Sequence, residues 1–197
     1  MSEKLSDYFG SDSPAPKAEQ EAGAEAPQKA DKVDSPVKKK QPKSSFEDRR
    51  RAARVAAVQA MYQLDQSTKP NVLAVLRDFV LFRAKEDLEG LRLGKFDKNL
   101  FQDIVAGVWE NQVAVDDMMT AILPVDWRTD RIDPVMKAIM RCGIYEIENK
   151  PDLPTAIIIG EYVSVAHGFF DGNEPNVINA GLDTIAKTLR DGELLEL

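Results

Sequence analysis

The sequence has 197 residues, of which 43% are hydrophobic, so it is long enough for one ordinary domain with a real core and some excess chain. Its single cysteine, Cys142, and single histidine, His167, exclude an internal disulfide framework and a zinc site built from Cys and His. The first 30 residues lack the apolar run of a signal peptide, and no stretch approaches the length of a membrane span. We therefore expect a cytoplasmic protein without a membrane partner.

The net charge of −7 is distributed unevenly along the chain. Residues 1–37 hold four lysines and eight acidic residues, whereas residues 38–54 hold eight Lys and Arg against two acidic residues. A concentrated basic segment on an otherwise acidic chain is typical of a directed electrostatic site. The total charge therefore does not exclude a polyanionic partner such as a nucleic acid.

Residues 1–45 are rich in Ser, Pro, Ala, Lys, Glu and Gln, and few large apolar side chains occur there. Such a segment cannot offset the entropy cost of ordering by burying apolar surface. We predict a disordered tail over residues 1–45 and a folded domain over residues 46–197.

From Phe46 onward the spacing of apolar residues is helical throughout. No convincing alternating strand and no Asn-Gly hairpin occurs, so the predicted fold class is all-α. Ser45 and Asp48 predict a capping box at the start of the first helix. We expect helices over residues 46–67, 71–89, 97–109, 115–122, 132–147, 154–169 and 177–189.

The first of these helices has two different faces. One face carries small residues that suit close packing against other helices. The other face brings Arg51, Arg54 and Tyr62 together with Val55 and Val58 at 100° per residue. Guanidinium groups beside a phenol ring suit a phosphate next to an unstacked base. The alternative is that the valines and the tyrosine are core and the arginines only begin the helix, and the pattern leaves both open.

Positive charge at a helix N-terminus opposes the helix dipole, which indicates that an anionic group compensates it.

Little in the sequence favours catalysis. His167 has no paired nucleophile in the sequence, and Cys142 lies within an apolar helix beside Gly143. No glycine-rich phosphate loop occurs, and the acidic residues are scattered. The sequence therefore points to a binding protein that is not an enzyme and has no metal and no cofactor.

An ordered series of short segments spans about residues 49–190 and resembles the family of the transcription antitermination factor NusB. The order of the segments is more specific than any one of them. They are Arg50-Arg51-Ala52-Ala53-Arg54 with Ala57-Val58-Gln59-Ala60-Met61-Tyr62; Phe101, Asp103 and Ala106-Gly107-Val108; Arg141, Tyr145 and Glu146; Leu153-Pro154, Glu161, Ala166 and Phe169; and Asn179, Leu182 and Asp183.

The resemblance implies a compact fold of about seven helices in two packed halves. It also implies a non-catalytic protein that binds boxA RNA, a short single-stranded element of ribosomal RNA leaders. The implied protein partner is NusE, a ribosomal small-subunit protein, and the RNA polymerase elongation complex is an indirect partner. By the same resemblance, Arg50, Arg51 and Arg54 would contact phosphates, and Tyr62, Phe169 and Asn173 would lie at the RNA surface.

The chain departs from the family pattern in three places. Ala52 replaces an arginine, Gly160 replaces an asparagine, and the segment 177–183 lacks its first aromatic residue and has its glycine shifted.

Two other hypotheses keep the fold. In ribosomal RNA cytosine methyltransferases a similar domain precedes an enzyme domain, for which this sequence has no room. In a protein-interaction module, a homodimer would mask the basic face, and the chain would not bind RNA by itself.

Overall fold

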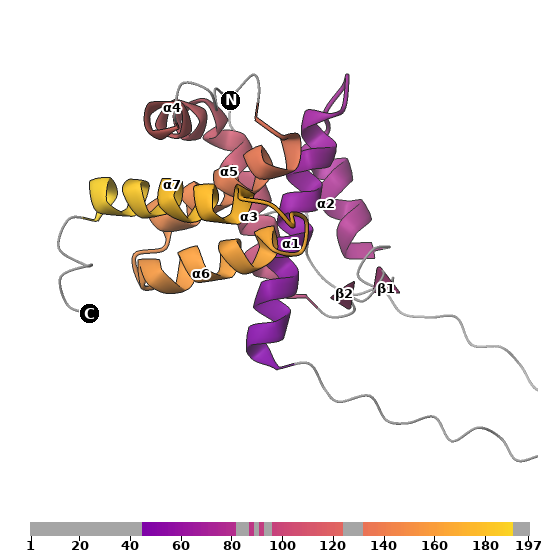
Figure 1. Cartoon of the computed structure of the whole chain (residues 1–197). Coiled ribbons are helices and arrows are strands. Elements are labelled where there is room, and N and C mark those ends of the chain that lie inside the picture. The colour runs from indigo at the N-terminus through magenta and orange to yellow at the C-terminus, as the bar shows by residue number, and fades with distance from the viewer. Residues whose placement is uncertain (1–44, 82–86, 89–90, 93–95, 124–131, 191–197) are drawn as a thin grey trace, which may run out of the picture. The chain divides into compact units, whose positions relative to one another are not determined.

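The computed structural model describes residues 45–81, 87–88, 91–92, 96–123 and 132–190. Within these residues the regular structure is almost entirely helical (Figure 1), which confirms the predicted all-α class. The predicted tail lies outside the described residues except for Ser45, so its boundary stays a prediction. The helices are α1 (Phe46–Asp65), α2 (Val72–Leu81), α3 (Lys98–Glu110), α4 (Gln112–Ile122), α5 (Pro134–Asn149), α6 (Thr155–Ala166) and α7 (Glu174–Leu189).

The prediction of one helix over residues 71–89 is wrong at its C-terminal end. Asp87–Leu88 forms a short strand, β1, that pairs antiparallel with Leu91–Arg92, β2. The apolar spacing that predicted the helix ends at Phe82, so the pattern did not require a helix as far as residue 89. Gly90, between the two strands in the sequence, and Gly94 had indicated a loop, but this loop was expected to begin only after residue 89.

Side-chain caps fix where several helices begin. Ser45 Oγ accepts a hydrogen bond from the Asp48 amide at 3.0 Å, and Asp48 Oδ2 accepts one from the Ser45 amide at 2.9 Å. The predicted capping box of α1 is therefore confirmed. Asp97 caps α3 and Asp133 caps α5 without a capping box, since each carboxylate accepts hydrogen bonds from two backbone amides of the first turn. Each such cap contributes about 1 kcal/mol to stability.

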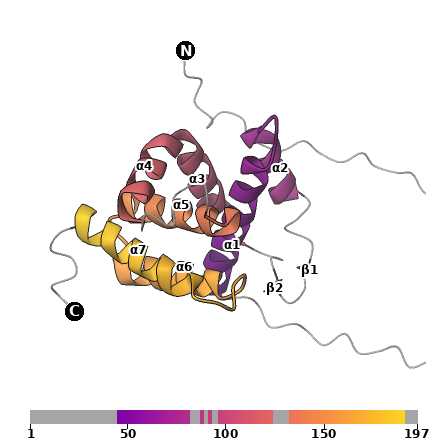
Figure 2. The same cartoon turned by 45° about the horizontal axis from the view of Figure 1, so that its top comes forward.

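The helices pack as two groups that meet along α1 and α5. In the first group, α1 packs against α2 and α3. In the second group, α4, α6 and α7 pack against α5, and α6 and α7 lie side by side (Figures 1 and 2). Contacts of α5 with α1 and α3, and of α6 with α1, join the groups. The arrangement in two packed halves that the resemblance implied is thus observed.

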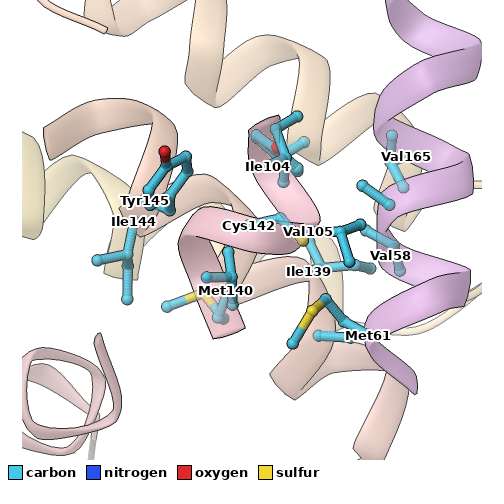
Figure 3. Close-up of a cluster of buried hydrophobic side chains, with 14 of the residues drawn as sticks. Val58, Met61, Ile104, Val105, Ile139, Met140, Cys142, Ile144, Tyr145 and Val165 are labelled. Carbon is cyan, nitrogen blue, oxygen red and sulfur yellow. The ribbon is translucent and has the colours of Figure 1, made fainter. Parts of the chain in front are cut away.

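Helix α5 forms the centre of the core. Eleven of its sixteen residues are buried, so it has no solvent-facing side along most of its length. Figure 3 shows this cluster, in which Ile139 and Cys142 of α5 lie among side chains from α1 and α3 such as Val58 and Ile104. Two of the buried residues of α5 are charged, Arg141 and Glu146. Because buried charges are costly without partners, both residues must be paired.

Gly107 allows α3 and α5 to approach closely. A Cβ atom at this position would lie 2.0 Å from Cζ of Tyr145, which is a severe overlap with a ring that is itself 7% exposed. The glycine of the Ala106-Gly107-Val108 segment is therefore required by packing.

Among the described residues, no helix is both long enough and apolar enough to cross a membrane.

Candidate nucleic-acid interface

Helix α1 is buried on both of its faces over most of its length. The predicted packing face is confirmed, since Ala53, Ala56 and Ala60 are fully buried. On the opposite face, however, Val55 and Val58 are only 3% and 1% exposed. For these two valines the alternative interpretation was right, because they belong to the core. The face that was expected to carry arginines and Tyr62 is therefore not one continuous surface.

Arg54 is held in a buried ion pair. Its side chain is 3% exposed, and its Nε and Nη2 atoms donate to Oε2 and Oε1 of Glu146 at 2.7 and 3.2 Å. Its Nη1 atom lies 3.5 Å from Oε2 of Glu161. Burial lowers the pKa of Arg54, but the hydrogen bonds to Glu146 together with the nearby negative charges of Glu146 and Glu161 outweigh this effect, and the net shift is upward. The predicted phosphate contact does not fit this position, where a phosphate has no access to the guanidinium.

Arg51 reaches the surface but already has an anionic partner. Its side chain is 53% exposed. Its Nη2 and Nε atoms donate to Oε1 and Oε2 of Glu161 at 2.7 and 3.2 Å, which is a bidentate pair between α1 and α6. The hydrogen bond to Glu161 raises the pKa of Arg51. Of the predicted phosphate-contacting residues, this one is accessible and fixed in position.

Arg50 points toward a different region of the surface. Its side chain is 24% exposed, and its Nη1 atom lies 3.8 Å from Oδ2 of Asp97. Its Cζ atom lies 5.6 Å from the centre of the Phe46 ring, within the range of a cation–π contact. Arg49 makes a similar contact at 6.0 Å, although Phe46 remains 62% exposed. Arg50 and Phe46 line a hollow of about 710 Å³ at the start of α1.

The positive charge at the start of α1 is thus compensated largely within the protein. Carboxylates of Glu161, Glu146 and Asp97 pair with three of the four arginines, and Asp48 lies in the first turn. The helix-dipole argument correctly indicated an anionic partner, but these partners are side chains of the same chain. For the arginines of the basic sequence segment, the electrostatic attraction is therefore weaker than the sequence suggested, and the four lysines of that segment lie outside the described residues.

Tyr62 and Phe169, both predicted at the RNA surface, lie around one hollow. Each is 40% exposed. The hollow has a volume of about 720 Å³, within the range of small-molecule pockets. Its other lining residues are Val58, Gln59, Gln63, Gln66, Ser67 and Val135. The structure therefore places two aromatic side chains beside several side-chain amides, a combination that can stack on a base and bond to its edge.

Arg51 and Tyr62 lie on the same side of α1. They are eleven positions apart in the sequence, so they differ by about 20° around the helix and by roughly 16 Å along it. Helix α6 packs against α1, with Glu161 at the Arg51 end, and Phe169 follows the end of α6. Because Val55 and Val58 between them are buried, Arg51 with Glu161 and Tyr62 with Phe169 are two accessible ends of this side of α1, and we call these two ends together the α1–α6 seam.

Asn173 is not part of this seam. It is exposed at the start of α7, where its Oδ1 atom accepts a hydrogen bond from Nδ2 of Asn176 at 2.9 Å. It lines a separate hollow of about 280 Å³ together with Ile122 and Val177. The structure brings Tyr62 and Phe169 together, therefore, and leaves Asn173 at another site.

Sequence reasoning did not identify Glu146 and Glu161 as the partners of the arginines. Both belong to the segments that resemble the NusB family. In the sequence, however, Glu146 lies 92 residues from Arg54, and Glu161 lies 110 residues from Arg51. One signal was available, because Glu146 lies between Tyr145 and Ile147 within a strongly apolar helix. An acidic residue in such a position needs a cation beside it.

The described residues offer little for metal or nucleophile chemistry. Within them, no group of three or more His, Cys, Asp or Glu side chains is arranged to hold a metal ion. Cys142 is fully buried, and burial raises the pKa of its thiol, which keeps it protonated. His167 is exposed at the end of α6.

Comparisons with known proteins agree with this fold. The model of the NusB family matches residues 51–187, which is more than half of the chain. The chain belongs to the NusB family. The transcription antitermination protein NusB of Rhizobium leguminosarum bv. trifolii is 40% identical over 160 residues, which cover 81% of this chain and 95% of the relative. The protein of the same name from Caulobacter vibrioides is 40% identical over 142 residues, covering 72% and 95%.

A solved structure shares the architecture of this NusB family member. T. maritima NusB superposes with a TM-score of 0.54 at 25% sequence identity, covering 74% of this chain and 96% of that structure. The match to the family includes the part of α1 that carries Arg51 and Arg54, α5 with Glu146, and α6 with Glu161. The seam therefore lies within the part of the chain that defines the family.

Proposed function

We propose that this chain is a non-catalytic transcription antitermination factor that acts in the cytoplasm. In this proposal it binds boxA-type single-stranded RNA of ribosomal RNA leaders together with NusE, on an elongating RNA polymerase. Membership of the NusB family and the name of its curated relatives support a role in antitermination. The observation that carries the RNA site is the α1–α6 seam, with Tyr62 and Phe169 around one hollow and Arg51 on the same side of α1.

The seam suits a single strand better than a duplex. Sequence-specific proteins recognise unstacked bases by stacking them on aromatic side chains and by hydrogen bonds to the base edges. The hollow supplies two half-exposed rings and the amides of Gln59, Gln63 and Gln66. Arg51, roughly 16 Å away along α1, would contact a phosphate of the same strand. Such spacing requires a strand of several nucleotides, which is consistent with a short linear element.

The internal ion pairs limit how strongly the free chain attracts RNA. Arg51 and Arg54 are paired with carboxylates at the seam, and Arg50, outside it, is paired with Asp97, so α1 presents fewer unpaired charges than the sequence suggested. We therefore expect modest affinity and a shallow salt dependence for the chain alone, since each phosphate contact to a single strand contributes a slope of about −0.7. A second RNA-binding protein such as NusE would supply the remaining contacts.

The test is the affinity for a boxA RNA, measured with and without NusE, for the wild type and for Arg51→Ala and Tyr62→Ala. Loss of one base stack costs about 1–3 kcal/mol, so Tyr62→Ala should weaken binding at least fivefold. Arg51→Ala should weaken it about five- to tenfold and make the salt slope shallower by about 0.7.

Arg77→Ala is the matched control, because Arg77 is an exposed arginine of α2, with a side chain that is 64% exposed. It should bind RNA as the wild type does. If the Arg51 and Tyr62 variants also retain full affinity while remaining folded, the seam is not the RNA site.

A homodimer that masks the seam is the second candidate. Tyr62 and Phe169 expose apolar surface around the hollow, and a second copy of the chain could cover it. Sedimentation with and without RNA separates the two functions. A dimer that converts to an RNA-bound monomer supports masking, whereas a dimer unaffected by RNA supports an interaction module without autonomous RNA binding.

A further inference from the structure

We propose that Glu161 is a positioning residue for RNA binding. Glu161 holds the Arg51 guanidinium by one edge, so that the other edge of this guanidinium can bind a phosphate of the RNA. The inference rests on the function proposed above and concerns the same seam. Glu161 lies on α6 and bonds to two arginines of α1, the half-exposed Arg51 and the buried Arg54. It thereby links the surface of the seam to the interior.

The geometry of the Arg51 guanidinium supports this role. Glu161 occupies the edge formed by Nε and Nη2, through contacts of 3.2 and 2.7 Å. A guanidinium has five N–H donors, and the edge between Nη1 and Nη2 can bind a second anion in the same bidentate manner. The side chain is 53% exposed, and the edge that Glu161 does not occupy is the one that the proposal assigns to a phosphate. Arg51 can therefore keep its bond to Glu161 and still bind a phosphate.

Glu161 is itself held from behind by a chain of alternating charges. Arg54 Nη1 lies 3.5 Å from the Glu161 carboxylate, and Glu146 fixes Arg54 through two shorter contacts. The exposed fractions of the side chains fall steadily from 53% for Arg51 to 19%, 3% and 0% for Glu161, Arg54 and Glu146. The orientation of Arg51 is thus determined by groups that are fixed in the core.

This proposal predicts that removal of the Glu161 charge lowers RNA affinity, whereas simple electrostatics predicts that it raises RNA affinity. Removal of a negative charge near a polyanion should tighten binding if charge alone matters. If Glu161 positions Arg51, its removal instead frees a long side chain that must be ordered again when RNA binds. Ordering one such side chain costs enough to weaken binding by about three- to tenfold.

The experiment compares full-length Glu161→Gln with the wild type, using boxA RNA and NusE as in the test of the proposed function. Glutamine keeps the size of the side chain but cannot accept two charge-assisted bonds from Arg51. We expect RNA affinity about three- to tenfold lower, with unchanged helical content in circular dichroism. Glu47→Gln is the control, since it removes an exposed acid from the first turn of α1 that has no part in the chain of ion pairs. It should bind as well as the wild type or slightly better.

A double-mutant cycle separates positioning from a general loss of stability. In the Arg51→Ala background no side chain remains to be positioned, so Glu161→Gln should cause no further weakening. If Glu161 only supported the fold, the two losses would add. The Nε–H signal of Arg51 in NMR spectra offers a second readout, because it should lose its protection from exchange in Glu161→Gln.

Arg51→Lys tests the same idea without altering the contacts of Glu161 to the core. Lysine keeps the charge, but it cannot present one edge to a carboxylate and another to a phosphate. We expect a loss of affinity close to that of Glu161→Gln, and this variant decides the matter if Glu161→Gln does not fold.

Affinity equal to or higher than that of the wild type, in Glu161→Gln or in Arg51→Lys, overturns the positioning role. If Arg51→Ala has no effect while Tyr62→Ala weakens binding, the positioning role also fails, but the seam stands. If neither Arg51→Ala nor Tyr62→Ala has an effect, the proposed function of the seam fails instead. The two failures are therefore distinguishable.

Discussion

Two buried arginines of this protein are each paired with two carboxylates, yet they lie in different settings. Arg141 of α5 donates to Asp65 of α1 at 2.6 Å and to both oxygens of Asp116 of α4 at 2.7 Å. Its carboxylates are 17% and 28% exposed, and the described contacts of this cluster end there. The cluster around Arg54 contains a fully buried carboxylate, Glu146, and continues to the surface through Glu161.

The two clusters differ in what they hold in place. The Arg141 cluster holds only helices, whereas the Arg54 cluster also reaches the surface that we propose as the RNA site. The Arg141 cluster fastens three helices of the two halves to one another. The Arg54 cluster fastens α1 to α5 and α6 and also fixes a surface arginine in the seam. The same chemistry thus stabilises the fold in one place and, in our proposal, prepares a binding surface in the other.

The largest effect is expected for Arg54→Ala. This change leaves Glu146, which has no exposed side-chain surface, without its main cation. Removal of one partner from a buried ion pair costs about 3–5 kcal/mol. This loss of stability should lower the midpoint of urea unfolding. A variant with wild-type stability and reduced RNA affinity would mean that Arg54 contacts RNA directly, as the sequence suggested, and would contradict the burial argument.

A smaller loss of stability is expected for Arg141→Met. Methionine fills much of the volume, and the remaining carboxylates of Asp65 and Asp116 are partly exposed, so water can solvate them. We expect a loss of about 1–3 kcal/mol in urea unfolding. RNA affinity, measured where the variant is fully folded, should equal that of the wild type. A clear loss of affinity would show that the two clusters are not functionally separate.

The smallest effect is expected for Arg50→Ala. The contact to Asp97 at 3.8 Å is long and partly exposed, and pairs of this kind contribute about 0–1 kcal/mol. Arg50 is turned about 100° from Arg51 around α1 and lies beside Phe46, so it is outside the seam. RNA affinity should fall by less than in Arg51→Ala. A larger fall would move the RNA site toward the hollow at the start of α1.

These differences show what the sequence could reveal and what it could not. The capping box at Ser45 and the packing face of α1 depend on residues that are close in sequence, and both were predicted correctly. The burial of Arg54 depends on Glu146, 92 residues away, and helical periodicity alone cannot find such a partner. The same limit applies to the hollow between Tyr62 and Phe169. Each residue was expected at the RNA surface, the first from its helix face and both from the family resemblance, but their shared hollow is a property of the packed helices.

The departure from the family pattern at Gly160 has no structural explanation. A Cβ atom at this exposed position of α6 would meet nothing within 4 Å, so packing does not require glycine there. Glycine within a helix costs about 1 kcal/mol relative to alanine. Nothing in the described residues explains why glycine is retained.

The most direct test of the central claim is to map where RNA lies on the protein. A boxA RNA that carries a photoreactive thiouridine can be crosslinked to the full chain in the presence of NusE, and the modified residues can be identified by peptide mass spectrometry. We predict crosslinks at Tyr62 and Phe169, on the two sides of the same hollow. Crosslinks confined to other surfaces, such as the exposed face of α2 or the start of α7, would contradict the assignment of the α1–α6 seam as the RNA site.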